Sequence, residues 1–568
     1  MMDHAPKDPG LGRLPSGYIK FLVFRPACTA GELEFDVIQT PLAPAPCYHA
    51  LSYAWNGTTN TRHIIVNSDR FAVTESVYNA LHSIRSISTR PESMDNAGIA
   101  DLPVWIDAVC INQDDLQERN DQVRQMDVIY SKAAKVLVYL GPVPPGDLNE
   151  VQLLMHATRD GMGGKLSADS TLWRHCVDWA IRKLRSRTWF DRAWVIQEVV
   201  LARFVMVVCG AYICPLDDLD NALINSEQTR NKVLYELRNA LASFQRLRDA
   251  RSSGNFRDCF MEVANARTLH CTDAHDHVFG LLGLLPLEDF PPEAIDYGIP
   301  VSDICIAATM YLTSHSCLSI ISSEHAGEAP CAIENLPSWV PEWSMPVRPH
   351  YYPWWMYSAG GGEALQPIDT TFQDAGRTLV LEGFVVGTVA TKRQISKLCS
   401  NAHTPPGFLR VDSQLLIDNL PGVHDISSVQ RTICADVALT YDTTAKQGFV
   451  YKRWQDIDGT EDTVRFPDHV EQRSPTMINE PLNIMESSDS DVFLTFDTGL
   501  IGLGRAHAQC GDIAIVFPGI TVPFILRKRD TSSHYKMIGP AYIHGIMDGE
   551  AMEALQRGDH KLETFSIT

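Results

Sequence analysis

The sequence predicts a protein of the α/β class, in which a mainly parallel sheet comes first, a helical region follows and a mixed, β-rich domain ends the chain. Strand-like and helix-like patterns alternate from about residue 19 to residue 210, as they do in parallel sheets whose strands are joined by helices. After Trp339, short β-rich runs are separated by Gly, Pro and Asp turns. The expected parts are a flexible N-terminus at 1–18, an α/β domain at 19–210, a mostly helical region at 211–335 and a β-rich domain at 336–568.

Short apolar runs in the first part, most of them followed by a turn signal, predict strands. They are Ile19–Phe24 before Pro26, Ala50–Trp55 before Asn56-Gly57, His63–Val66, Val104–Ile106 before Asp107, and Val136–Leu140 before Gly141-Pro142. The runs that begin at Ala50, Val104 and Val136 are typical of buried parallel strands. We expect these three strands to lie side by side, with their carboxyl ends at the edge of the sheet where ligands bind.

Helices are predicted where apolar residues recur on one face. Val77, Leu81 and Ile84 follow the helical spacing i, i+4, i+7. Two further stripes predict helices in the same way: Trp173, Val177, Ala180 and Leu184, and then Leu234, Leu237, Leu241 and Phe244.

One long helix is expected after Asp114, which can cap it because Gln117 follows in the capping-box position. Glu118 and Arg119 are expected near the rim of the sheet. Apolar residues of this helix recur every seven positions at Leu116, Val123 and Tyr130, with Met126 and Ile129 between them. Those expected to face the sheet are Val123, Met126, Ile129 and Tyr130.

The β-rich part contains several strand-like runs between turn residues. Gly499, Gly502 and Gly504 are interpreted as turn glycines, since they open no helix and are spaced wrongly for a phosphate loop. The expected strands are Leu379–Leu381, Val385–Val389, Val492–Phe496, Ile513–Phe517 and Phe524–Leu526.

The composition excludes several classes of protein. Forty-eight basic and 69 acidic side chains give a net charge of −21, which disfavours binding to nucleic acid and to anionic membranes. No apolar run is long enough to span a bilayer and no secretion signal is evident, so a cytoplasmic protein is expected. The 14 cysteines form no Cys-x-x-Cys pair, so we expect reduced thiols and neither a metal nor a bound cofactor. His270, His275 and His277 are expected to be solvated or capping residues.

Several segments, in order, resemble the fungal heterokaryon incompatibility (HET) domain family in its stand-alone form. The match extends over most of the chain, with one departure: Asn56 stands between Trp55 and Gly57, where the family pattern has Trp followed directly by Gly. The segments that carry the resemblance are Tyr48–Trp55, Val104–Gln113, Arg187–Glu198, Thr272–Gly283, Leu336–Trp343 and Tyr542–Glu550.

The resemblance implies a fungal cytosolic protein that acts in nonself recognition or regulated cell death. It also implies a fold similar to the TIR domain, with a flavodoxin-like sheet. Some TIR relatives cleave NAD with a glutamate that lies four residues after a tryptophan on a helix, and Trp194 and Glu198 have that spacing. The resemblance therefore makes Glu198 the candidate catalytic residue and NAD, or a related nucleotide, the candidate substrate.

The chemistry can also be argued from the residues. Breaking the bond between nicotinamide and ribose develops positive charge on the sugar, as in glycoside hydrolysis, and a carboxylate facing that charge stabilises the transition state. Glu198 is a residue of the required type next to an apolar run. The alternative is that Glu198 only forms an ion pair with Arg187 or Arg192.

The candidate substrate-binding residues lie mainly at strand ends. Ser52, Tyr53 and Trp55 close one predicted strand, and Asp107 ends another. Trp194 would present its ring from the same helix face as Glu198. A core position for the tyrosine and a turn-capping role for the aspartate remain as alternatives.

Three functions remain open on the sequence. The first is nucleotide hydrolysis within a HET-type nonself response. The second is a cyclase or pericyclase of fungal secondary metabolism, suggested by Asn56 and the aromatic segment His350–Tyr357. The third is a non-catalytic recognition module that self-associates or binds a partner protein.

Overall fold

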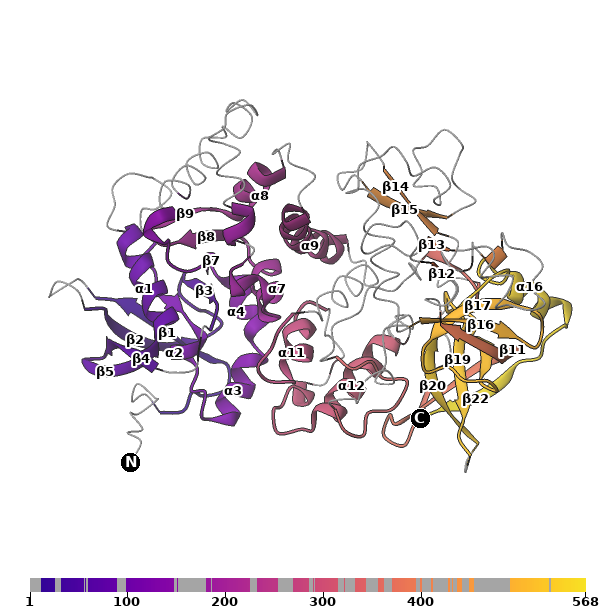
Figure 1. The fold of residues 1–568 in the computed structure, drawn as a ribbon. Coiled ribbons are helices and arrows are strands. Elements are labelled where there is room, and N and C mark those ends of the chain that lie inside the picture. Colours follow the sequence, from indigo (N-terminus) through magenta and orange to yellow (C-terminus); the bar gives the residue numbers. More distant parts are fainter. Residues whose placement is uncertain are drawn as a thin grey trace. The chain divides into compact units, whose positions relative to one another are not determined.

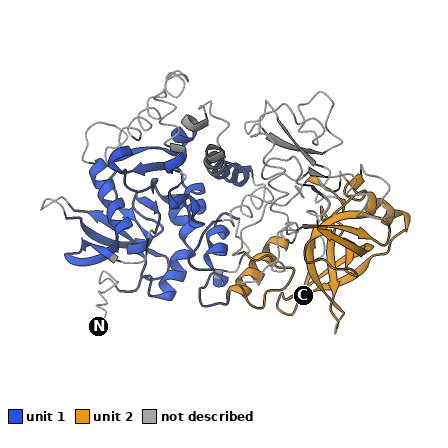
Figure 2. Ribbon diagram, viewed as in Figure 1, with its two compact units in different colours: residues 1–300 blue, residues 301–568 orange. Residues whose placement is uncertain are grey.

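A computed structural model describes two compact units, residues 1–300 and 301–568, which are coloured separately in Figure 2. Each unit is considered by itself. The residues described are 12–25, 32–55, 57, 60–88, 99–147, 151, 180–184, 186–224, 232–253, 269–285, 290, 292–314, 321, 333–343, 356–361, 370–394, 399–400, 410–411, 428–429, 432, 437–441, 449–453, 491–530 and 533–568.

The first unit is built on a nine-stranded sheet of order β5-β4-β2-β1-β6-β3-β7-β8-β9 (Figure 1). Its middle strands β6, β3, β7 and β8 run parallel to one another, and the expected side-by-side arrangement of the three predicted strands is confirmed. The strands are β1 (Tyr18–Phe24), β2 (Glu34–Pro41), β3 (His49–Tyr53), β4 (Asn60–Val66), β5 (Asp69–Thr74), β6 (Val104–Trp105), β7 (Lys135–Tyr139), β8 (Val205–Cys209) and β9 (Tyr212–Pro215).

The rest of this sheet contains more antiparallel pairs than expected, since the alternating strand and helix patterns predicted a mainly parallel sheet. β1 pairs antiparallel with β2 and β6, β4 with β5, and β8 with β9. Hairpins join β4 to β5 and β8 to β9, because short turns join antiparallel strands whereas parallel strands need a crossover. In the parallel centre of the sheet, β3 and β8 are buried along their whole length, and β7 is buried at all but its first residue, Lys135. β2 and β4 also pair parallel, nearer the edge.

Helices cover the sheet on both sides, with α1 (Glu75–Ser88) on one side and α4 and α7 on the other (Figure 1). The predicted stripe of α1 is confirmed, since Val77, Leu81 and Ile84 are each at most 1% exposed. The other helices of the unit are α2 (Asp107–Cys110), α3 (Leu116–Val123), α4 (Met126–Lys132), α7 (Trp194–Val200), α8 (Leu216–Ile224), α9 (Lys232–Ser253) and α11 (Asp276–Leu282).

The single helix expected after Asp114 is in fact two helices, α3 and α4, which are interrupted at Arg124-Gln125. Met126, Ile129 and Tyr130 of α4 are buried as predicted, whereas Val123 at the end of α3 is only partly buried. Leu116, the first residue of the seven-residue recurrence, is 48% exposed. Glu118 is not at a rim: it is buried against Lys20 of β1.

The N-cap of α3 is Asp115 and not the predicted Asp114. Its side chain accepts hydrogen bonds from the backbone N–H groups of Gln117 and Glu118, at 3.0 and 3.1 Å. Asp115→Ala is therefore expected to lower the free energy of unfolding by about 1 kcal/mol, whereas Asp114→Ala should change it by a few tenths. Urea unfolding of the two variants checks this, and equal losses would contradict the assignment of the cap.

Other predicted helices are partly outside the described residues. Trp173 and Val177 lie outside them, while Ala180–Leu184 forms one π-helical turn. In α9, Leu241 and Phe244 are buried as the stripe predicts.

The second unit begins with α12 (Val301–Ser314) and continues into a sheet of order β18-β19-β20-β22-β11-β16-β17-β21. An additional pairing of β18 with β11 closes β18, β19, β20, β22 and β11 into a barrel. The elements are β10 (Thr371–Gln373), β11 (Thr378–Gln394), β12 (Cys399–Ser400), β13 (Arg410–Val411), β14 (Val437–Tyr441), β15 (Phe449–Arg453), β16 (Asp491–Phe496), β17 (Ile501–Arg505), β18 (Ile513–Val516), β19 (Phe524–Lys528), β20 (His534–Pro540), β21 (Tyr542–Ile543), α16 (Glu550–Arg557) and β22 (Glu563–Ile567).

The two strands predicted at Leu379 and Val385 are one 17-residue strand, β11. Gly383, which separates the two predicted runs, and Gly387 both lie inside the strand. A Cβ at Gly383 would lie 2.7 Å from the ring of Phe517, so this glycine allows close packing inside the barrel. Near Gly387 the register with β18 shifts, as it does where a bulge bends a strand around a barrel.

Candidate functional site

Glu198 lies on α7, whose apolar sequence buries the helix in the first unit, and is itself 2% exposed. Ser52, near the end of β3, donates a hydrogen bond from its hydroxyl to Oε2 of Glu198. The indole N–H of Trp189 in turn donates to Ser52 Oγ at 2.7 Å. Ser52 and Trp189 thus fix the orientation of the Glu198 carboxylate. The carboxyl end of β3 and helix α7 meet at this point.

Arg192 is the basic residue beside Glu198. Its Nη1 lies 3.9 Å from Glu198 Oε1 and also donates to the backbone carbonyl of Tyr53. Arg187, the other partner considered from the sequence, donates instead to the carbonyl of Pro142 at 3.1 Å. The contact between Arg192 and Glu198 is at the long limit of an ion pair, so it orients the carboxylate less strictly than Ser52 does.

Asp107 begins α2 and is separated from β6 by one residue, Ile106, at the carboxyl end of the strand next to β3. Its Oδ2 accepts the indole N–H of Trp55 at 3.1 Å, and its Oδ1 accepts the backbone N–H of Ala108 at 2.7 Å. The ring of Trp55 is 42% exposed and stacks on Tyr53, with centroids 6.4 Å apart. Trp55 and Asp107 therefore form the solvent-facing side of the cluster.

The buried groups of this cluster have shifted pKa values. Desolvation raises the pKa of Glu198 to about 7, although the Arg192 guanidinium and the Ser52 hydroxyl oppose that shift. Desolvation also raises the pKa of Asp107, against the opposing charge of Arg192. Tyr53 has a buried hydroxyl without a hydrogen bond of standard geometry, and burial together with the Asp107 charge raises its pKa. Perturbed acids that gather at strand ends are typical of functional sites.

The raised pKa of Glu198 predicts a pH-dependent loss of stability. The folded chain holds the Glu198 proton more tightly than the unfolded chain, whose carboxyl titrates near 4.5. The free energy of unfolding should therefore fall as the pH rises from about 4.5 to about 7, and Glu198→Gln should lack this contribution. Urea unfolding at about pH 5 and about pH 8 measures it: relative to wild type, the variant should gain stability at the higher pH. A difference that does not change with pH would contradict the shift.

Two family models match the chain: "Heterokaryon incompatibility protein (HET)" over residues 48–198 and "Het-6 beta-barrel domain" over residues 454–562. The chain is also 25% identical to heterokaryon incompatibility protein 6, OR allele, of Neurospora crassa over an alignment of 670 residues that covers 96% of each chain. The resemblance of the chain to HET-domain proteins is therefore confirmed. No solved structure matches it significantly.

The HET match begins at Tyr48 and ends at Glu198, so it contains every residue of the cluster described above. The barrel match is narrower than the barrel, because β11 precedes residue 454 and β22 follows residue 562. No helix among the described residues is long and apolar enough to cross a membrane.

Trp194 is the candidate residue whose described contacts are with α11. Its ring packs beside Gly280 of α11, where a Cβ would lie 3.5 Å from Trp194 Cδ2. It also contacts Asp276, where a hydrogen bond from Trp194 opposes the rise in pKa that burial causes. The spacing from Trp194 to Glu198 is as the sequence indicated, but the described contacts of the tryptophan hold α11 to α7.

The segment that contains His270, His275 and His277 forms a polar network with the HET domain. Asp273 accepts hydrogen bonds from Arg119 Nη2 at 2.9 Å and lies 2.7 Å from His275 Nδ1. Arg119 also stacks its guanidinium over the ring of Tyr297, at 3.4 Å from the centroid. Among the described residues, no group of His, Cys, Asp and Glu could hold a metal ion.

Three residues of the cluster were not assigned to a site from the sequence. Arg192 appeared only as an ion-pair alternative, Tyr130 was expected to face the sheet, and Trp189 was part of the segment Arg187–Glu198. Tyr130 is 1% exposed and its hydroxyl helps to lower the pKa of Glu198. Arg192 and Trp189 belong to the same short motif as Glu198, and that common motif is the signal that could have identified them.

Proposed function

We propose that this HET-domain protein acts in the cytoplasm, in fungal nonself recognition and regulated cell death, and that its HET domain hydrolyses the glycosidic bond of NAD or a related nucleotide. The observation that carries the proposal is the cluster itself: Glu198, Ser52 and Arg192 lie beside Tyr53 and Asp107 at the carboxyl ends of parallel strands. The name of the Neurospora relative supports the biological role.

In the proposed step, water attacks the ribose carbon C1′ as the bond to the nicotinamide nitrogen breaks. The electron pair of that bond neutralises the pyridinium, so nicotinamide leaves uncharged, and the proton of the water passes to solvent. The ionised Glu198 stabilises the positive charge that develops on the sugar. Ser52 and Trp189 hold the carboxylate in one orientation, which saves reorganisation in the transition state.

Access to Glu198 sets a condition on this proposal. Glu198 is 2% exposed, whereas Trp55 is 42% exposed, so a substrate must enter along Trp55 and Asp107. Arg192, at 18% side-chain exposure, lies beside Glu198 and must move when ribose arrives. Its guanidinium is then free to bind a phosphate of the nucleotide.

The exposed ring of Trp55 suits the oxidised nicotinamide. A pyridinium cation over the indole face, with the Asp107 carboxylate beside it, gains both cation–π and Coulomb attraction. Trp55→Ala is therefore expected to raise the KM for NAD about tenfold or more, since one such contact contributes about 1–2 kcal/mol. Trp55→Phe should retain part of the affinity. Steady-state kinetics of the three proteins tests the proposal, and a KM that is unchanged in Trp55→Ala would contradict this mode of binding.

No feature of the described residues favours the other two functions, a cyclase or pericyclase and a non-catalytic recognition module. Asn56 and residues 350–355, which suggested a cyclase or pericyclase, lie outside the described residues. Tyr357 of that segment is 3% exposed and packs edge-on to Tyr542, as a core residue does. A purely recognising or self-associating protein would bind its partner and leave NAD intact.

A further inference from the structure

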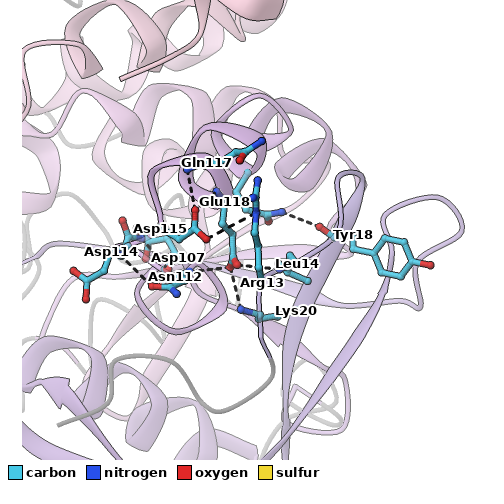
Figure 3. A network of polar contacts seen from close by, with 12 residues as sticks. Arg13, Leu14, Tyr18, Lys20, Asp107, Asn112, Asp114, Asp115, Gln117 and Glu118 are labelled. Atoms are coloured by element: carbon cyan, nitrogen blue, oxygen red, sulfur yellow. Dashed lines mark hydrogen bonds and ion pairs between the residues drawn. The ribbon is translucent and has the colours of Figure 1, made fainter. Parts of the chain in front are cut away.

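Lys20 of β1 and Glu118 of α3 form an ion pair that water hardly reaches (Figure 3). Lys20 Nζ lies 3.0 Å from Glu118 Oε1, and the two side chains are 1% and 0% exposed. Burying such a pair costs desolvation that its attraction repays only when further hydrogen bonds are made. Here they are made: Oε1 also accepts the backbone N–H of Asn112 at 2.9 Å, and Oε2 accepts that of Leu14 at 3.0 Å.

The Asn112 contact leads to the candidate site. Asn112 lies in the loop after α2, and α2 begins at Asp107. The neighbours of Asn112 on both sides bind the backbone of that aspartate: Ile111 N–H and Gln113 Nε2 each donate to the Asp107 carbonyl, at 3.1 Å. Figure 3 shows Asp107, Asn112 and Glu118 in one connected network.

The sheet alone holds Asp107 weakly. β6, which precedes it, is two residues long, and it is in register with β3 at two positions and with β1 at one. A strand this short makes few ladder hydrogen bonds, so its carboxyl end needs a second attachment to hold a side chain in one place. The buried carboxylate of Glu118 supplies that attachment from α3.

We propose that Glu118 is a positioning residue: through the backbone of Asn112 it fixes the loop that holds the Asp107 carboxylate against the indole N–H of Trp55. The inference rests on the proposed function for the role of Asp107 toward substrate. The geometry that it claims is measurable without any nucleotide.

The test uses the indole N–H resonance of Trp55 in a ¹H–¹⁵N spectrum, assigned by its absence in Trp55→Phe. Asp107→Ala gives the position of the resonance when the hydrogen bond is lost. Two double variants are compared, Lys20→Met with Glu118→Gln and Lys20→Met with Glu118→Met. Both remove the two buried charges, but only the glutamine keeps an oxygen that can accept the Asn112 N–H. The methionine variant should move the Trp55 resonance to the Asp107→Ala position, and the glutamine variant should leave it at the wild-type position.

Phe35→Leu is the matched control, because it loosens the same sheet at a fully buried residue of β2. It should leave the Trp55 resonance in place. An unmoved resonance in the methionine variant, or an equal shift in Phe35→Leu, would overturn the inference. If the methionine variant does not fold, Asn112→Pro removes the same N–H while the ion pair stays. The expected shift is then the same, and its absence overturns the inference equally.

The spectra are recorded without nucleotide, so the two proposals fail separately. If the protein leaves NAD intact but shows the expected shifts, the proposed function fails and the positioning role of Glu118 stands. If the protein hydrolyses NAD but the Trp55 resonance does not shift, the proposed function stands and the positioning role of Glu118 fails.

Discussion

Replacing Glu198 with Gln is expected to leave the chain folded and to lower its turnover of NAD about a hundredfold or more. That is the usual cost of losing one preorganised electrostatic contact to the charge that develops in a transition state. The amide has the shape of the carboxylate and can still accept from Ser52, which binds Glu198 Oε2, but it carries no negative charge toward the ribose. Turnover and melting temperature are to be measured on the same preparations at about pH 8, where the wild-type carboxylate is ionised.

Asp127→Asn is the matched control for this variant. It makes the same change from carboxylate to amide on α4, at a partly buried residue outside the cluster, and should keep wild-type turnover. If Glu198 serves only as the partner of Arg192, the result is reversed: Glu198→Gln lowers stability and turnover does not change.

The second large effect is expected from Lys20→Met, which should lower the free energy of unfolding by about 3–5 kcal/mol. The variant leaves the Glu118 carboxylate buried without its cation, and removing one member of a buried pair typically costs that much. The side chains are 1% and 0% exposed, so little water can replace the lost ammonium. Urea unfolding of wild type and variant measures the difference.

Adding Glu118→Gln to Lys20→Met should recover much of that loss, because no charge then remains buried and the amide oxygen can still accept from Leu14 or Asn112. A single variant that loses less than about 1 kcal/mol would behave like an exposed pair. That result would contradict the burial of Glu118.

The sequence predicted the centre of the first sheet well. The runs at Ala50, Val104 and Val136 are mostly apolar, as is typical of parallel strands that are covered on both faces. The hairpin partners were harder to identify. β2 is mixed in burial along its length, so its sequence shows neither a continuous apolar run nor a clean alternation.

Glu118 shows what periodicity cannot indicate. Charged residues are almost always exposed unless they are paired, so a glutamate on a helix is expected on the outer face. Its partner Lys20 is 98 residues away in sequence, and a pairing over that distance has no local signal. The same holds for Ser52 and Glu198, which are 146 residues apart.

The proximity of several candidate residues could be predicted from the expected sheet. Ser52, Tyr53 and Asp107 were chosen because carboxyl ends of parallel strands gather functional groups, and the structure brings these residues together with Glu198. The placement of Trp194 followed from spacing alone. Spacing fixes the helix face but not the partner of that face, and α11, which supplies the partner, lies about 80 residues further along the chain.

The central claim is tested most directly by incubating the purified full-length chain with NAD and separating the products by chromatography. The account predicts that nicotinamide and ADP-ribose accumulate in equal amounts as NAD disappears, and that the rate rises with pH through about 7 as Glu198 ionises. NAD that stays intact across that pH range, with protein shown to be folded, would contradict the account.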